Sequence, residues 1–213
     1  MASYRNILDF VRKWEDGLVY FPEEGQYTNR GVQWTTFKAL APKLLGIKNP
    51  TVDDLKDMSQ AQGDKFIEYY WNLATDGNRI ENQAVANAFF EALWGGGQSG
   101  VKWLQKKLGV YPDGRVGNVT VSAANKADPE TTVKEILNRF NYLAESSPSR
   151  YGRFIDGWRN RWNDLYRISK PFFFETLPGV TVFEKKNNNL GKIALFAGVG
   201  AVIYYFYTKK KNK

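Results

Sequence analysis

Glu15 is the residue whose type and position best suit acid–base chemistry. It follows apolar residues that recur three and four positions apart, namely Tyr4, Ile7, Leu8, Val11 and Trp14. This spacing predicts an amphipathic helix, and side chains four apart share a face, so Glu15 should point roughly where Val11 points. A carboxyl group partly removed from water has a raised pKa and can donate a proton near neutral pH. Most glutamates at the end of a helix are simply solvated, so the spacing alone leaves both interpretations open.

A polar segment directly after Glu15 supplies further reactive groups. Residues 16–31 contain additional carboxylates, hydroxyls, amides and three glycines. A carboxylic acid that stays protonated near neutral pH is the general acid that a glycosidase needs at the leaving group.

The chain contains neither cysteine nor histidine. Disulfides, Cys–His or Ser–His nucleophiles and zinc sites built on these residues are therefore excluded. Acid–base work by glutamate and aspartate is the leading option for an enzyme, and we expect neither a metal nor a cofactor. Aromatic residues make up 15% of the chain, which weakly supports sugar-stacking platforms.

The formal charge of +8 is concentrated at one end of the chain. Seven lysines and no acidic residue follow Glu184, and the remaining residues carry 23 basic against 22 acidic side chains. A nucleic-acid-binding protein would be expected to carry its charge on the folded body. The sequence therefore predicts no nucleic-acid partner.

Residues 190–207 form an apolar run interrupted by Lys192 alone, with tyrosines towards its C-terminal end and lysines on both sides. As a helix this segment would be roughly 27 Å long, close to the thickness of a bilayer's hydrocarbon core. We expect a C-terminal transmembrane helix here; a buried helix of a soluble fold is the alternative.

The body reads as all-α. Apolar stripes with helical spacing predict a succession of helices, Pro42 should shift or break one of them, and Gly95-Gly96-Gly97 should separate two halves. A short piece near residues 180–182 is the one place where alternation suggests a strand.

The residues around Glu15 resemble the start of glycoside hydrolase family 108. The similar stretches are FVRKWEDG at 10–17 and EGQYTNRGV at 24–32, Tyr70-Trp71, Asn82-Gln83 with Val85-Ala86, Phe89-Phe90, Leu104-Gln105 with Leu108-Gly109-Val110, Asp113-Gly114 with Gly117 and Thr120, and Phe154-Ile155 with Gly157-Trp158 and Asn160-Arg161. The similarity runs in order over roughly residues 5–167. Asp16 replaces a usual glycine, Leu18 a usual aromatic, and 24–26 depart from the family's glycine pair.

The resemblance implies a lysozyme-like N-acetylmuramidase with Glu15 as general acid. Glu24, nine residues later, has a spacing similar to that of the paired acids of phage-type lysozymes, whereas Thr28 could instead position a water. Asn29 would support the loop or bind sugar. Tyr70 and Gln105 are expected to bind substrate.

The predicted organisation follows from this resemblance. Residues 1–94 would form the catalytic part and 95–170 a helical peptidoglycan-binding part, followed by a linker (171–189), the transmembrane helix (190–207) and a basic tail (208–213). We expect a membrane-anchored peptidoglycan hydrolase of a phage, in a virion membrane or the host inner membrane, acting in the virion or in lysis.

The expected partners are bacterial peptidoglycan, a lipid bilayer and, in a virion, other virion proteins. The altered glycine loop leaves one alternative, a catalytically decayed lysozyme-like protein that binds glycan or serves as a structural membrane protein of a virion.

Overall fold

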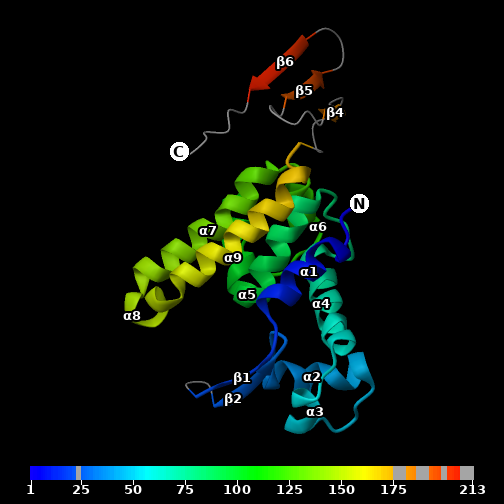
Figure 1. Cartoon of the computed structure of the whole chain (residues 1–213), viewed down its shortest axis with the longest axis vertical. Coiled ribbons are helices and arrows are strands. Elements are labelled where there is room, and N and C mark those ends of the chain that lie inside the picture. The colour runs from blue at the N-terminus through cyan, green and yellow to red at the C-terminus, as the bar shows by residue number, and fades with distance from the viewer. Residues whose placement is uncertain (23–24, 175–180, 186–191, 198–200, 207–213) are drawn as a thin grey trace.

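A computed structural model of the chain describes residues 1–22, 25–174, 181–185, 192–197 and 201–206, with side chains described up to residue 174 (Figure 1). Helices dominate, as expected. They are α1 (Arg5–Trp14), α2 (Trp34–Leu45), α3 (Val52–Lys56), α4 (Gln60–Thr75), α5 (Gln83–Lys107), α6 (Asn118–Ala124), α7 (Pro129–Ser146), α8 (Pro148–Tyr151) and α9 (Ile155–Ser169), with 3-10 turns η1 (Gly152–Phe154) and η2 (Lys170–Phe172).

Local signals explain where several helices begin. Thr51 and Asp54 form a reciprocal capping box at α3, and the Asp128 carboxylate accepts from the Thr131 amide ahead of Pro129 at the start of α7. Pro42 was expected to shift or break its helix, but α2 continues through Pro42 to Leu45. It lies in the C-terminal half of α2, which Gly46 ends in the left-handed conformation.

The segment after Glu15 is a small antiparallel sheet, where the sequence indicated only a loop. Its strands are β1 (Leu18–Phe21), β2 (Gln26–Asn29) and β3 (Val32–Gln33), in the order β1-β2-β3 with Val19 opposite Thr28. The expectation of an all-α body was wrong here, since the short runs of β-branched and aromatic residues in β1 and β2 were masked by the polar residues around them.

Two clusters of buried side chains hold the described body together. One cluster includes Phe37 and Leu55 and gathers β3, α2, α3 and Phe66 of α4. The larger cluster includes Val11 and joins α1, α4, α5, α6, α7 and α9. Trp94 packs against both clusters, so the small lobe at the lower end of Figure 1 and the helical lobe in its middle meet beside this residue. The predicted boundary at 94/95 lies within the range of α5, shortly before Gly97, whose backbone is not helical. A kink at Gly97 divides α5 into two helical segments, as the three successive glycines predicted.

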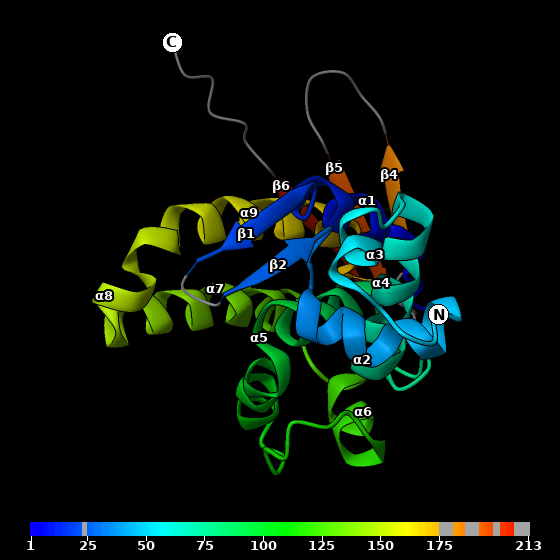
Figure 2. The ribbon, with the colours of Figure 1, turned by 90° about the horizontal axis from the view of Figure 1, so that it is seen from below.

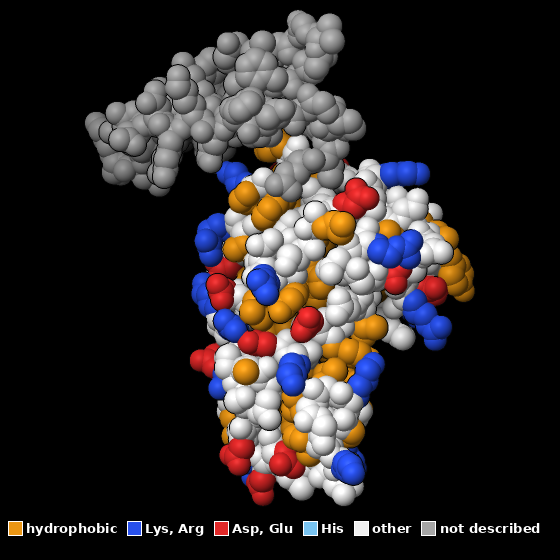
Figure 3. Space-filling model, turned by 90° about the vertical axis from the view of Figure 1, so that its right-hand side faces the viewer, with side chains coloured by type: hydrophobic (Ala, Val, Ile, Leu, Met, Phe, Trp, Pro, Cys, Tyr) orange, Lys and Arg blue, Asp and Glu red, His pale blue; other side chains and the backbone are white. Residues whose placement is uncertain are grey.

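Helices α7 and α9 run side by side and meet through α8 at their far end (Figure 2). On the face seen in Figure 3, basic and acidic side chains are interspersed with apolar ones rather than gathered by sign.

The predicted helix over 190–207 differs from the structure where that segment is described. Strand β5 (Lys192–Ala197) pairs antiparallel with β4 (Thr181–Lys185) on one side and β6 (Ala201–Phe206) on the other. Periodicity alone cannot tell whether an apolar run forms a helix or strands. Residues 201–206 are rich in β-branched and aromatic side chains, which favour a strand. The rest of 190–207 and the tail 208–213 lie outside the described residues. Among the helices of the described part, none combines the length and apolarity needed to cross a bilayer.

Candidate active site

Glu15 follows the last residue of α1, and its backbone N–H donates to the Val11 carbonyl at 2.9 Å, so the helical hydrogen-bond pattern reaches Glu15 as the sequence predicted. Its Oε1 accepts two hydrogen bonds, from Trp94 Nε1 at 3.0 Å and from an Arg161 guanidinium nitrogen at 2.7 Å. The side chain is 24% exposed. The carboxyl group is therefore fixed by partners from α5 and α9 while part of it stays open to solvent.

Arg161 is shared by Glu15 and a second carboxylate, Glu91. It contacts Glu91 through two hydrogen bonds of 2.6 and 2.9 Å and lies over the Phe10 ring. Burial alone would lower the pKa of Arg161, but Glu91 and then Glu15 raise it above its ordinary value. Burial raises the pKa of Glu91, whose side chain is 2% exposed, and the contact with Arg161 opposes that rise. One buried cation thus serves two carboxylates of unequal exposure.

Two cavities meet at Glu15. The first, of about 460 Å³, lies between the lobes and is lined by Thr28, Gly31, Tyr70 and Trp94 among others. The second, of about 500 Å³, is lined by residues of α1, α5, α7 and α9. Glu15 and Gly95 line both cavities. A polymer crossing Glu15 would therefore find walls on both sides of the carboxyl group.

Gly31, between β2 and β3, shows how closely the β1-β2-β3 sheet (hereafter the hairpin) approaches Glu15. Its φ is +76°, a conformation that favours glycine, and a Cβ there would lie 2.8 Å from the Trp94 ring and 2.9 Å from Glu15 Oε2. The second carboxyl oxygen of Glu15 thus lies against the Gly31 backbone, where there is no room for a side chain.

Thr28 and Tyr70 also belong to this region. Both line the first cavity, and the Tyr70 ring meets Trp94 edge-on at 5.3 Å. Thr28 Oγ1 is buried, and within the described side chains it is the buried polar atom left without a hydrogen-bond partner. Such a group calls for an explanation, since nearly all buried polar atoms in proteins are paired. Glu24 lies outside the described residues.

The structure places the other two predicted site residues away from the cavity walls. The buried Asn29 amide donates to the Leu55 and Lys56 carbonyls, which is the loop-supporting role rather than the sugar-binding one. Gln105 was expected to bind substrate, but it is 1% exposed.

The Gln105 amide is held by its neighbours. Its Nε2 shares its two N–H donors among Asp113, the Arg115 carbonyl and Thr120, and its Oε1 accepts from the Gly114 amide. It organises the 113–120 turn, and its burial keeps it from contact with a glycan.

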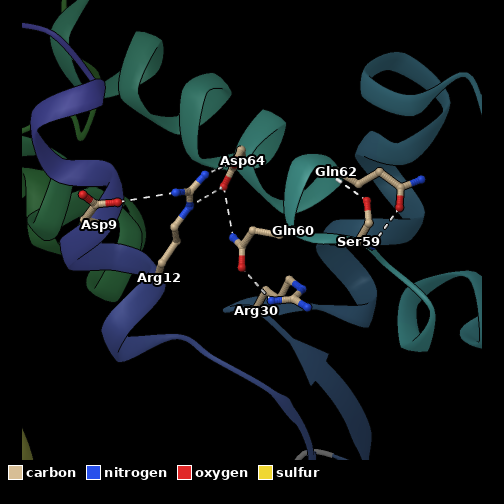
Figure 4. A network of polar contacts seen from close by, with 7 residues as sticks. All are labelled: Asp9, Arg12, Arg30, Ser59, Gln60, Gln62 and Asp64. Carbon is tan, nitrogen blue, oxygen red and sulfur yellow. Dashed lines mark hydrogen bonds and ion pairs between the residues drawn. The ribbon is translucent and has the colours of Figure 1, made fainter.

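A polar network attaches the hairpin to α1 and α4 (Figure 4). Arg12 of α1 binds Asp64 of α4 at 2.6 Å, and Gln60 bridges from Asp64 to Arg30 at 3.1 and 2.7 Å. Arg30 also donates to the Met58 carbonyl at 3.1 Å. The chain immediately before Gly31 is therefore anchored, which keeps the hairpin at a set distance from Glu15.

Sequence reasoning assigned no role to Trp94, Glu91 or Arg161, although all three surround the predicted acid. Glu91 is an acidic residue within an otherwise apolar helical stretch, which is a signal of a buried, paired charge. Within the described part of the chain, no three acidic side chains gather as a metal site would require.

Comparisons with known proteins agree with part of the expected relationship. A family model described as a predicted peptidoglycan domain matches residues 99–163. No curated protein sequence matches the chain. The chain is similar to the solved structure titled "Structure of Brucella abortus SagA", with a TM-score of 0.66 and 24% sequence identity over 80% of this chain and 95% of that chain. At this identity the similarity shows a shared fold.

The family match confirms the predicted relationship of the C-terminal half to a peptidoglycan domain. Membership of glycoside hydrolase family 108 stays a prediction.

Proposed function

We propose that this chain hydrolyses peptidoglycan, cleaving the β-1,4 bond between N-acetylmuramic acid and N-acetylglucosamine with Glu15 as general acid. The observation that carries the proposal is the position of Glu15 at the junction of two cavities, its carboxyl group held by Trp94 and Arg161. The match of residues 99–163 to a predicted peptidoglycan domain supports the choice of substrate.

Glu15 is the carboxyl group of the pair that a glycan can reach. Glu91 takes two hydrogen bonds from Arg161 and is nearly fully buried, while Glu15 takes one from Arg161 and is the more exposed carboxyl. We therefore assign the proton transfer at the cavity to Glu15. It would protonate the glycosidic oxygen as the bond to the anomeric carbon breaks, and a water molecule would complete hydrolysis.

Thr28 is our candidate for orienting that water, because the residue lines the cavity and its Oγ1 makes no hydrogen bond within the protein. Its Oγ1 is shielded from solvent in this structure, so contact with the water would require a small shift of β2. Glu24, which lies four residues before Thr28 in the sequence, remains the alternative.

The test compares the wild type with Glu15→Gln on purified peptidoglycan, counting new reducing ends and identifying products by mass spectrometry. General acid catalysis contributes typically about 10²–10⁴-fold, so we expect a loss of at least about a hundredfold. Asp16→Asn is a matched control, because Asp16 is the exposed neighbouring carboxylate and should retain activity. Wild-type activity in the Glu15→Gln variant would remove Glu15 from the mechanism.

A binding-only role is the second candidate, favoured by the match to a peptidoglycan domain. Under this alternative the wild type would sediment with cell walls without producing new reducing ends, so the same product analysis separates the two functions.

Attachment to a bilayer through residues 190–207, in a phage virion membrane or the host inner membrane, is a separate proposal supported by the apolar, lysine-flanked sequence. The full chain should float with liposomes, and a variant with Leu195 and Ile203 both replaced by Asp should not. Recovery of the full wild-type chain free of lipid would contradict it.

A further inference from the structure

The second cavity is built by both halves of the described body. Its lining includes Trp14 and Glu91 from one side of the 94/95 position and Arg139, Tyr151 and Trp158 from the other. It starts at Glu15, so a glycan bound in the first cavity would extend into it. Its occupant would therefore be part of the same ligand.

Arg139 is the unusual residue of this cavity. It is 8% exposed, and one guanidinium nitrogen donates to Ser99 Oγ at 3.1 Å. Among the described residues no carboxylate lies within 4 Å of it, whereas Arg161 in the same cavity holds two. Burial lowers the pKa of Arg139. Glu91 attracts it from farther away but is already bound by Arg161.

The chain makes room for this guanidinium. A Cβ at Gly96 would lie 2.7 to 2.9 Å from the Arg139 guanidinium atoms, so the flat group rests directly on the backbone of α5. Burying a charge without a partner is costly, and buried arginines are normally paired. A guanidinium carries five N–H donors in a planar arrangement that matches a carboxylate with two parallel hydrogen bonds.

The neighbouring wall is aromatic. The Trp158 ring stacks on Phe140 at 5.1 Å, and Tyr151 lies 5.8 Å from Trp158. These rings offer an apolar surface of fixed orientation beside the cation. The combination fits a sugar that carries a carboxylate, as muramic acid does through its lactyl group or the peptide attached to it.

We propose that the second cavity binds a carboxylate carried by the muramic acid residues of peptidoglycan, with Arg139 as the residue that recognises it. This inference rests on the proposed function for the identity of the glycan. It makes the site selective for peptidoglycan over uncharged glycans such as chitin.

The experiment measures binding by calorimetry in the Glu15→Gln background, so that turnover does not interfere. Four probes are titrated: a tetrasaccharide of alternating N-acetylglucosamine and N-acetylmuramic acid with free lactyl carboxylates, its methyl ester, the same tetrasaccharide bearing stem peptides, and chitotetraose. Each is repeated after Arg139→Met, after Arg139→Lys, and after Arg167→Met, which removes an exposed arginine of α9 as the control.

We expect Arg139→Met to weaken binding of at least one carboxylate-bearing tetrasaccharide by about tenfold or more, the usual effect of losing a charged hydrogen bond, and to leave chitotetraose unchanged. Arg139→Lys should retain part of the affinity. The methyl ester should bind like chitotetraose to unaltered Arg139, a comparison that holds even if an Arg139 variant fails to fold. The probe that responds to Arg139 identifies the source of the carboxylate, lactyl group or stem peptide.

Equal loss for chitotetraose, or equal binding of the ester and the free acid together with no response of the stem-peptide probe, would overturn the proposal. Its failure is distinguishable from failure of the proposed function. If the wild type releases no reducing ends but charged glycans still bind through Arg139, hydrolysis fails and the carboxylate site stands. If the wild type hydrolyses peptidoglycan and Arg139 makes no difference, the reverse holds.

Discussion

Arg161 donates to Glu15 Oε1 at 2.7 Å although 146 residues separate them in the chain. This contact joins α9 to the end of α1 and places a largely buried cation of the C-terminal half directly on the predicted acid. The half that matches a peptidoglycan domain therefore helps to build the candidate active site.

Arg161→Met should destabilise the protein by about 3–5 kcal/mol, because it leaves two carboxylates without their shared cation. Urea unfolding measures the change. Arg159→Met, two residues away and exposed, should stay within about 0.5 kcal/mol of the wild type. Equal stability of the two variants would mean that the Glu15–Arg161–Glu91 contacts contribute nothing net to folding.

Gly31→Ala should impair both folding and activity. The new Cβ would meet Trp94 and Glu15, in a backbone conformation that costs other residues roughly 1–2 kcal/mol. Gly25→Ala is the matched control, because Gly25 also has a positive φ but nothing lies within 4 Å of its added Cβ. Both variants carry the strain, so a larger loss of peptidoglycan cleavage in Gly31→Ala isolates the displacement of Glu15. Matching losses would contradict the close approach.

Falling pH should remove the stability that Asp64 contributes. Burial alone would raise its pKa, but hydrogen bonds from Arg12 and Gln60 hold it below its ordinary value of 3.8. A lowered folded-state pKa gives stability that is present above the unfolded pKa and is lost as pH falls through the folded one. The difference in unfolding free energy between wild type and Asp64→Asn should thus be level from about pH 7 to 5 and shrink below about pH 4.

Asp156→Asn, which alters an exposed carboxylate of α9, is the control variant measured over the same pH range. A gap for Asp64→Asn that persists unchanged to about pH 2 would show that the ion pair does not lower its pKa.

Periodicity predicted the elements whose burial is regular, and tertiary contacts decided the rest. Ile7 and Val11 of α1, like Val133 and Ile136 of α7, repeat at helical spacing and are buried where that spacing puts them. The pairing of β1 with β2 was not predicted, because each strand is only four residues long and the sequence between them is polar. The partnership of Glu15 with Arg161 depends on how α9 packs against α1, which no local pattern encodes.

For Gln105 the sequence suggested a ligand contact where the structure shows a contact within the protein. It lies in a segment that resembles a peptidoglycan-binding one, and polar residues there suggest ligand contacts. Its partners Asp113, Gly114 and Thr120 follow within fifteen residues, and together they form a buried turn scaffold. The sequence shows that Gln105 is polar and lies in this segment, whereas the structure shows that its side chain holds the 113–120 turn together.

Thr28→Val should separate a functional hydroxyl from a structural one. Because Thr28 Oγ1 is buried without a hydrogen bond, replacing it by a methyl group of similar size should leave stability unchanged or slightly raised. If the hydroxyl orients the attacking water, cleavage of peptidoglycan should fall by about tenfold or more, and Thr28→Ser should restore it. Thr35→Val, on the exposed side of α2, controls for the loss of a hydroxyl nearby. Full activity of Thr28→Val with normal stability would leave Glu24 as the group that assists Glu15.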